Sequence, residues 1–224
     1  ANPRTIVVIL AGSPVSLEAY VNQVQGVMQA WFPGMEGGHA LAALLAGDVS
    51  PSGKLPVTLP KLLADVPSAN NFPGNEKEVI YAEGLMLGYR HYDTKEVEPR
   101  FPFGHGLSYT SFEYSNLSLA RRGKEAEVSF EIKNSGLRKG AEVAQVYVAP
   151  PKSKLPRPMQ ELKSFGKYVL EPGQSQKVTL RLNERAFQYW NSAKQGWTAD
   201  PGSYRIRVGS SSRDIRLSGD LKLP

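Results

Sequence analysis

The 224-residue sequence predicts an α/β portion with an incomplete parallel sheet, followed by an all-β sandwich of antiparallel strands. A continuous β-branched run opens the chain, and short runs of alternating polarity fill the second half. The charge also differs, since residues 1–110 carry 7 Lys and Arg against 10 Asp and Glu, whereas residues 111–224 carry 20 against 11. We therefore expect folded units at residues 1–60 and 111–224, joined by an extended bridge over residues 61–110.

The first unit begins with TIVVIL, residues 5–10, which is typical of a strand buried on both faces of a parallel sheet. VQGVMQAWF, residues 24–32, fits strand or helix, and we favour a strand because Gly26 and the aromatic pair disfavour a helix. EGGHALAALLAG, residues 36–47, predicts a helix that its last glycine ends. GKLPVTLP, residues 53–60, predicts a short third strand, and its prolines imply an edge position or an early end.

Three strands and one helix cannot cover both faces of a parallel sheet. Residues 1–60 are therefore expected to be the end of an α/β domain whose beginning is missing from this sequence. The N-terminus shows no pattern of a signal peptide. Residues 61–110 are rich in Pro, Gly, Asn and charged side chains, with EGLMLGYRHYD, residues 83–93, as an ordered island. So long an irregular segment is expected to lie over a neighbouring surface.

From Phe112 onward the pattern becomes all-β. Six short alternating runs cover residues 112–120, 125–134, 141–149, 176–183, 203–209 and 214–219. Glycine-containing turns separate most of them. Roughly 110 residues with about seven strands fit one antiparallel β-sandwich.

The composition excludes several classes of site. The chain has no cysteine, which removes disulfides, cysteine-based zinc sites and thiol nucleophiles and leaves the redox compartment undecided. It has no apolar run near the roughly 18 residues that a membrane span needs. The basic second half could suit nucleic acid, but its charges alternate with apolar residues as on solvated strand faces. We therefore expect neither a membrane span nor a nucleic-acid partner.

Two glycine-containing stretches raise the question of a phosphate or cofactor site. In GDVSPSGKLP, residues 47–56, five residues separate Gly47 from Gly53 where a phosphate-binding loop has four, and Leu55 replaces the Ser or Thr. A turn before a strand explains this stretch better. PGMEGG, residues 33–38, could offer backbone amides to an anion, but it lacks dinucleotide spacing and close packing explains its glycines equally well. We expect no bound cofactor.

The ionisable residues give no clear catalytic set. The three histidines, His39, His91 and His105, show no His-x-x-x-His pairing, so a metal site is not expected. The carboxylates of Glu36, Asp48, Glu83 and Asp93 could form an acid/base pair. Each also has a structural role available, at a helix N-terminus, in a turn or in a salt link to the neighbouring Arg90, and we favour those roles.

Three further positions have both functional and structural interpretations. His105 lies in FPFGHGLSYTSFEY, residues 101–114, either as a catalytic group on a flexible loop or as part of a seam between folded units. Trp190 and Trp197 could stack on sugar rings, but we favour a place in the sandwich core. Asn116-Leu117-Ser118 is a glycosylation sequon, which is informative only in a secreting eukaryote.

Several segments together resemble family 3 glycoside hydrolases, the β-glucosidase and β-xylosidase group. The segments AGSP, WFPGMEGG, GDVSPSGKLP, EGLMLGYRHYD and FPFGHGLSYTSF, at residues 11–14, 31–38, 47–56, 83–93 and 101–112, occur in that family's order. Asn134, Gly136, Gly140, Glu142, Val143, Gln145 and Tyr147 are similar to the motif of its fibronectin type III-like domain. The resemblance covers nearly the whole chain.

The resemblance implies the end of an α/β sandwich domain followed by a fibronectin type III-like, immunoglobulin-like sandwich. It also implies part of a retaining β-glycosidase that removes terminal non-reducing β-linked glucosyl residues with two carboxylates about 5 Å apart. In the family, the nucleophile lies in an N-terminal (β/α)8 barrel, and the β-glucosidase acid/base lies earlier in the α/β domain. No residue here matches either, so we assign no catalytic, cofactor-binding or metal-binding residue. His105 then resembles a seam residue.

The resemblance further implies that this chain is inactive alone. Its expected partners are the N-terminal barrel portion, as a separate chain, a nicked product or a missing segment, and a carbohydrate substrate. The family implies a periplasmic or extracellular location. The alternative is a standalone glycan-binding or structural β-sandwich module without catalytic activity, with the basic sandwich and its two tryptophans, Trp190 and Trp197, as a glycan platform.

Overall fold

The computed structural model describes residues 2, 4–75, 77–153 and 155–224. Its α/β layer contains β1 (Ile6–Ile9), β2 (Gly26–Gln29) and α1 (Gly37–Ala46). The strands β1 and β2 pair in parallel, with Ile6 opposite Gly26, so the second apolar stretch is a strand as predicted. Gly47 ends α1 in the left-handed conformation, at a φ of 82°, as its position predicted.

The predicted third strand at residues 53–60 is wrong. Within the described residues the α/β sheet has two strands, and the segment forms only one isolated antiparallel bridge, between Leu59 and Phe101. Pro56 and Pro60 have no N–H to donate to a ladder. The N–H groups of Leu55 and Leu59 instead bond to the carbonyls of His105 and Phe101, at 2.8 and 2.9 Å. The segment therefore joins the α/β layer to a later part of the chain.

The two-stranded sheet is open to solvent. No residue of β1 or β2 is fully buried, although parallel strands are normally covered on both faces. Ile6 is 52% exposed, and beyond β2 Phe32 and Met35 are 81% and 98% exposed. The described residues of this chain therefore leave the layer uncovered.

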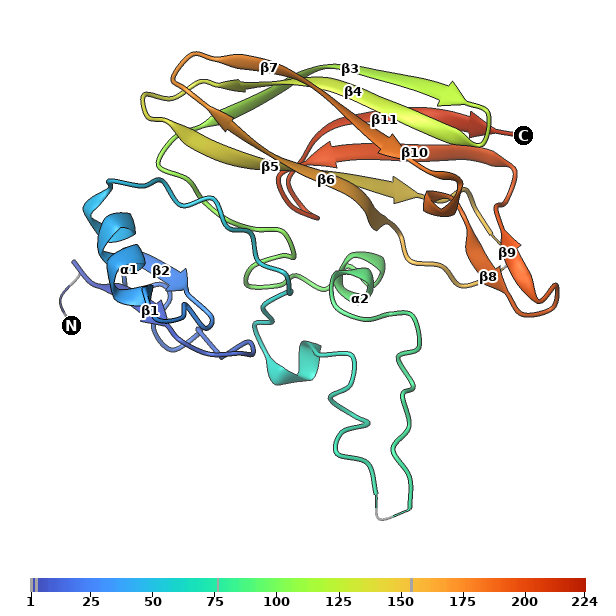
Figure 1. Ribbon diagram of the computed structural model, residues 1–224. Helices are drawn as coiled ribbons and strands as arrows, with labels where there is room; N and C mark the ends of the chain where they lie inside the picture. Colours follow the sequence, from blue (N-terminus) through green and yellow to red (C-terminus); the bar gives the residue numbers. More distant parts are fainter. Residues whose placement is uncertain (1, 3, 76, 154) are drawn as a thin grey trace.

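Residues 61–100 contain two short helices, η1 (Leu63–Asp65) and α2 (Tyr89–Thr94), within irregular backbone. Figure 1 shows that the chain between these helices runs away from both folded layers and returns. We call residues 66–75 and 77–86 the arm. Because α2 lies beneath the sandwich and η1 beside the α/β layer, the base of the arm sits between the two units.

The second half is a two-sheet antiparallel sandwich. One sheet has the order β11-β10-β5-β6 and the other β3-β4-β7, and a separate hairpin pairs β8 with β9. Their bounds are β3 (Phe112–Arg122), β4 (Glu125–Asn134), β5 (Gly140–Ala149), β6 (Glu161–Leu170), β7 (Ser175–Leu182), β8 (Tyr189–Asn191), β9 (Gly196–Thr198), β10 (Gly202–Gly209) and β11 (Ile215–Leu223), with the short helix η2 (Glu184–Ala186) before β8. The sandwich prediction is confirmed, whereas the boundaries at residues 60 and 111 stay predictions.

The core lies between these two sheets. Alternate residues of β4, such as Val128, Phe130 and Ile132, are at most 1% exposed and face Val146 and Ile206 of the opposite sheet. Each such side chain contributes about 1.5–3 kcal/mol when it leaves water. All members of this core lie at residue 112 or beyond. The sandwich therefore has a core of its own, and the other segments pack against its surface.

Candidate functional site

Two of the four carboxylates considered for an acid/base pair, Glu36 and Asp48, lie too far apart to form one. Glu36 is the N-cap residue of α1, and Asp48 follows Gly47 at its other end. A ten-residue helix is about 15 Å long, far more than the roughly 5 Å between the carboxylates of a retaining glycosidase. The exposed Glu36 carboxylate lies 2.6 Å from His39 Nδ1 instead. Glu36 thus lies at the N-terminal end of α1 without a side-chain cap hydrogen bond, and Asp48 lies just beyond the other end.

Asp93 anchors α2 to the sandwich. It is 4% exposed, and its Oδ1 lies 2.5 Å from Arg213 Nε. Its Oδ2 accepts a hydrogen bond of 2.9 Å from Gln160 Nε2. The predicted salt link to Arg90 is wrong, because Arg90 pairs with Glu161 at 2.8 Å. Sequence alone could not find the Arg213 partner, which lies 120 residues away.

His105 lies in the seam between the α/β layer and the sandwich. Its ring stacks on Phe101 with 5.0 Å between ring centroids. Burial lowers the pKa of its imidazole, and the Lys54 ammonium lowers it further, against a smaller opposite effect of Asp214. The preceding Gly104 has a φ of 81°, and a side chain there would collide with Gln145. The structure thus supports the seam interpretation.

The same seam holds a buried ion pair that the sequence did not single out. Lys54 Nζ lies 3.2 Å from Glu142 Oε2 and donates to the Gly106 carbonyl at 3.0 Å. Tyr114 donates its hydroxyl to Glu142 Oε1 at 2.8 Å. Burial, with the adjacent Glu142 carboxylate, raises the pKa of Tyr114. Both members of the pair lie in segments that carry the family resemblance, which was the available signal.

The remaining motif residues are scattered. Gly37 allows close packing, since a Cβ there would come within 2.7 Å of the Pro33 ring. His39 and His91 lie on α1 and α2. Among the described residues, no group of three or more His, Asp or Glu side chains could hold a metal ion. In the same part of the chain, no helix has the length and apolarity to cross a membrane.

A large apolar groove lies between the α/β layer, the bridge and α2. It has a volume of about 680 Å³ and is lined mainly by prolines and aliphatic side chains of residues 14–16, 56–68 and 87–92. Thr58 in its wall is 8% exposed, and its Oγ1 has no hydrogen-bond partner among the described residues. Such a groove can receive apolar side chains.

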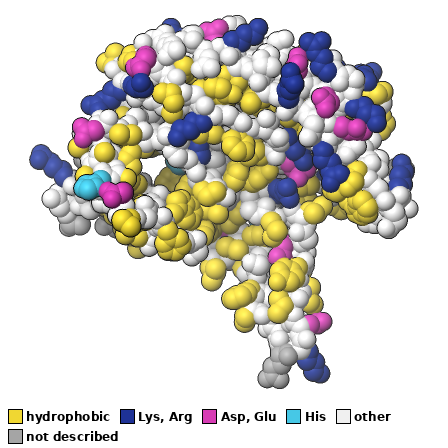
Figure 2. All heavy atoms as spheres, viewed as in Figure 1, with side chains coloured by type: hydrophobic (Ala, Val, Ile, Leu, Met, Phe, Trp, Pro, Cys, Tyr) yellow, Lys and Arg dark blue, Asp and Glu magenta, His cyan; other side chains and the backbone are white. Residues whose placement is uncertain are grey.

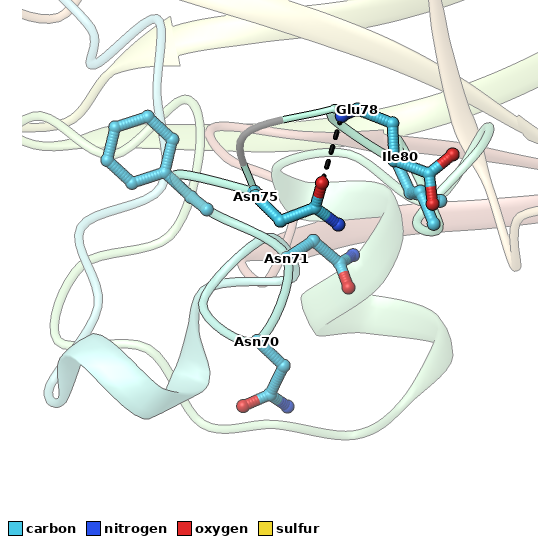
Figure 3. A pocket seen from close by; sticks show the side chains of 7 residues that line it. Asn70, Asn71, Asn75, Glu78 and Ile80 are labelled. Atoms are coloured by element: carbon cyan, nitrogen blue, oxygen red, sulfur yellow. Dashed lines mark hydrogen bonds between the residues drawn. The ribbon is translucent and has the colours of Figure 1, made fainter.

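The end of the arm forms a second, smaller pocket of about 280 Å³. Figure 3 shows the amides of Asn71 and Asn75 and the carboxylate of Glu78 on one side of the loop, whereas Asn70 points away from them. Asn75 Oδ1 accepts a 3.0 Å hydrogen bond from the Glu78 N–H, which fixes the turn. Among the described residues that line it, Glu78 contributes a carboxylate and the three asparagines contribute amides, so the pocket offers hydrogen-bonding groups.

The two tryptophans do not lie in the sandwich core, so that prediction is wrong. Trp190 and Trp197 face each other across the β8–β9 hairpin at 5.5 Å, and are 47% and 46% exposed. The Arg185 guanidinium lies over the Trp197 ring. Phe187 and Tyr204 fill the adjacent core instead. The tryptophans pack on each other because a two-stranded hairpin has no second sheet to cover them.

Comparison with known proteins identifies both halves. Residues 1–109 match the Glycosyl hydrolase family 3 C-terminal domain, and residues 142–212 match the Fibronectin type III-like domain. The chain is 46% identical to Thermostable beta-glucosidase B of Acetivibrio thermocellus, over 97% of this chain and 29% of that protein. It is 43% identical to an Exo-alpha-(1->6)-L-arabinopyranosidase of Bifidobacterium breve, over 99% of this chain and 30% of that protein.

Solved structures agree with these matches. The GH3 beta-glucosidase of Bifidobacterium adolescentis superposes with a TM-score of 0.95 at 42% identity, over 97% of this chain and 32% of that one. The chain thus spans about a third or less of the length of its relatives, which carry the remainder in the same polypeptide. The chain belongs to glycosyl hydrolase family 3 and is the C-terminal part of such an enzyme, comprising the end of its α/β domain and its fibronectin type III-like domain.

Proposed function

We propose that the intact protein is a retaining β-glycosidase of the β-glucosidase type, which removes terminal non-reducing β-linked glucosyl residues. In it, this chain completes and braces the active-site domains and carries neither catalytic carboxylate. The proposal is carried by one observation. The two-stranded parallel sheet stays uncovered in a chain that spans less than a third of the length of relatives named as beta-glucosidases. That sheet becomes stable only when further polypeptide covers its faces.

A retaining mechanism needs an acid/base and a nucleophile about 5–5.5 Å apart. Among the described residues, Glu36 and Asp48 lie at opposite ends of α1, and Asp93 is held by Arg213 and Gln160. As the resemblance to family 3 implies, the N-terminal (β/α)8 barrel supplies the nucleophile and the earlier part of the α/β domain supplies the acid/base. The sandwich holds the α/β layer in place through the Lys54–Glu142 seam.

The simplest test compares the 224-residue chain with the intact protein on an aryl β-glucoside. We expect turnover by the intact protein and none by the chain alone. Turnover by the isolated chain would show that its own residues form a catalytic pair and would refute the assigned role. A periplasmic or extracellular location belongs to the same proposal, which the cysteine-free composition permits, and cell fractionation tests it.

A second candidate function is glycan binding by the sandwich. The half-exposed Trp190 and Trp197 favour it, because indole faces suit the C–H-rich faces of sugar rings. Their ring planes meet at 67°, so they offer separate ring faces and no flat platform. This function predicts that the chain binds a β-glucan in affinity electrophoresis and that Trp190→Ala abolishes the retardation. Equal mobility of the chain with and without the glucan would exclude it.

A further inference from the structure

The pocket at the end of the arm combines hydrogen-bonding and apolar side chains. Asn71, Asn75 and Glu78 contribute two amides and a carboxylate. Phe72 and Ile80, which are 77% and 57% exposed, contribute apolar surface. Figure 2 shows the arm projecting from the rest of the molecule, with hydrophobic side chains along it. A small dissolved molecule can therefore reach the pocket in this chain.

A turn holds the Asn75 amide in one orientation. Asn75 Oδ1 accepts hydrogen bonds from the N–H groups of Lys77 and Glu78, at 2.8 and 3.0 Å. An amide oxygen has two lone pairs, so these two bonds use both. The Asn75 Nδ2 group, with its two donors, is the part that a ligand can bind. Because the turn holds this group in place beforehand, binding loses less side-chain entropy.

Donors and acceptors converge on one side of the loop. Figure 3 shows the amides of Asn71 and Asn75 and the carboxylate of Glu78 on this side. An amide both donates and accepts hydrogen bonds, and an ionised carboxylate accepts them at two oxygens. Adjacent hydroxyl groups match this set, because each hydroxyl also donates and accepts.

The same set disfavours other classes of ligand. Among the described residues, no group of three or more His, Asp or Glu side chains could hold a metal ion. The Glu78 carboxylate repels a phosphate or a sulfate. A wholly apolar molecule would take the amides out of water without giving them a hydrogen bond. A pyranose ring has hydroxyl groups around its edge and C–H groups on its faces, so it suits both kinds of side chain.

We propose that the pocket at the end of the arm binds one neutral pyranose ring. The two amides and the Glu78 carboxylate bind its hydroxyl groups, and its C–H face lies against Phe72 and Ile80. The volume of about 280 Å³ lies just below the roughly 300–1,000 Å³ of pockets that hold drug-sized molecules, so it suits a single ring. The inference is independent of the proposed glycosidase activity and of the hairpin tryptophans.

NMR of the intact protein, isotope-labelled at nitrogen in its asparagines alone, tests the proposal with D-glucose as the probe. We expect the side-chain signals of Asn71 and Asn75 to shift along a saturating curve, with a dissociation constant on the order of 1 mM. The signal of Asn70, which points away from them, should stay in place. D-mannitol has the hydroxyl groups without the ring and should shift none of the three signals. Unmoved Asn71 and Asn75 signals with glucose, or equal shifts with mannitol or inorganic phosphate, would overturn the proposal.

Matched asparagine variants give an independent readout. Asn71→Ala should weaken glucose binding at Asn75 about tenfold, because it removes hydrogen bonds that the ring cannot replace. Asn70→Ala should leave the affinity unchanged, and both positions lie outside the sandwich core, so both variants should fold. Equal affinities of the two variants would contradict the proposed site. The Trp190→Ala variant should keep the Asn75 shifts, and their loss would assign the sugar to the hairpin and contradict the arm site.

Discussion

Lys54 Nζ lies 3.2 Å from Glu142 Oε2, and the two side chains are 11% and 5% exposed. One comes from the segment that follows the α/β layer and the other from β5 of the sandwich. A buried pair of this kind is no source of large net stability, but loss of one partner leaves an uncompensated buried charge. The pair therefore holds the orientation of the two units.

Glu142→Gln should destabilise the chain by about 3–5 kcal/mol, because it leaves the Lys54 ammonium buried without a counter-charge. Urea unfolding followed by tryptophan fluorescence measures this change. Lys139→Ala is the control, since Lys139 forms an exposed pair with Glu171 worth less than about 1 kcal/mol. Equal losses for both variants would mean that the seam pair is not effectively buried.

Asp93→Asn should free α2 from the sandwich, because it removes the charge that holds Arg213. We expect faster hydrogen exchange in residues 89–94, with β10 unchanged. Asp220→Asn, which breaks an exposed pair with Arg205, should leave α2 unaffected. Unchanged exchange in α2 would show that Tyr89 and Thr94, which accept hydrogen bonds from the N–H groups of Leu162 and Met159, suffice to hold it.

The seam should weaken in acid through His105. The folded-state pKa of His105 lies below the ordinary value of 6.5. Above pH 6.5 the ring is therefore neutral in the folded and the unfolded chain, and the free energy of unfolding has its full value. As the pH falls below 6.5 the unfolded chain binds the proton first, and stability is lost down to the folded pKa. His105→Phe should remove this part of the pH dependence, measured by urea unfolding at pH 5.5 and 7.5. If the free energy of unfolding of the variant falls with pH as steeply as that of the parent, other groups cause the pH dependence.

Gly104→Ala should cost about 1–3 kcal/mol more than Gly123→Ala because of steric overpacking. Both glycines have positive φ, at 81° and 64°, so the backbone penalty is shared. A methyl group at Gly104 collides with the Gln145 side chain, whereas at Gly123 it meets open space. Comparing the thermal unfolding of the two variants isolates the part of the destabilisation that the steric clash causes. Equal melting temperatures would show that Gln145 can move aside.

The elements predicted correctly are those whose signal is local. The β-branched run of β1, the leucine face of α1 with Gly47 behind it, and the alternating residues of β4 each fix their own conformation. The strand β6 was missed because its large side chains Leu162, Phe165 and Tyr168 are spaced three residues apart in the sequence, and a bulge beside Lys163 interrupts the alternation of faces. The predicted strand at residues 53–60 failed because its prolines leave too few donors for a ladder.

The candidate site was less predictable because it depends on distant parts of the chain. Arg213 reaches Asp93 across 120 residues, and Glu142 reaches Lys54 across 88. The exposure of Trp190 and Trp197 depends on a hairpin outside both main sheets. Local sequence gives no information on such neighbours.

The sandwich closes its core with residues from 112 onward, whereas the α/β layer keeps its strands half open. During synthesis the ribosome releases the layer before the sandwich, so the sandwich, whose core uses no residue before 112, can fold last. Exchange of the sandwich between related enzymes would therefore have to preserve both the Lys54–Glu142 and the Asp93–Arg213 contacts with the rest of the chain. A domain boundary placed within the α/β layer would instead expose apolar strand faces on both pieces, which favours their aggregation.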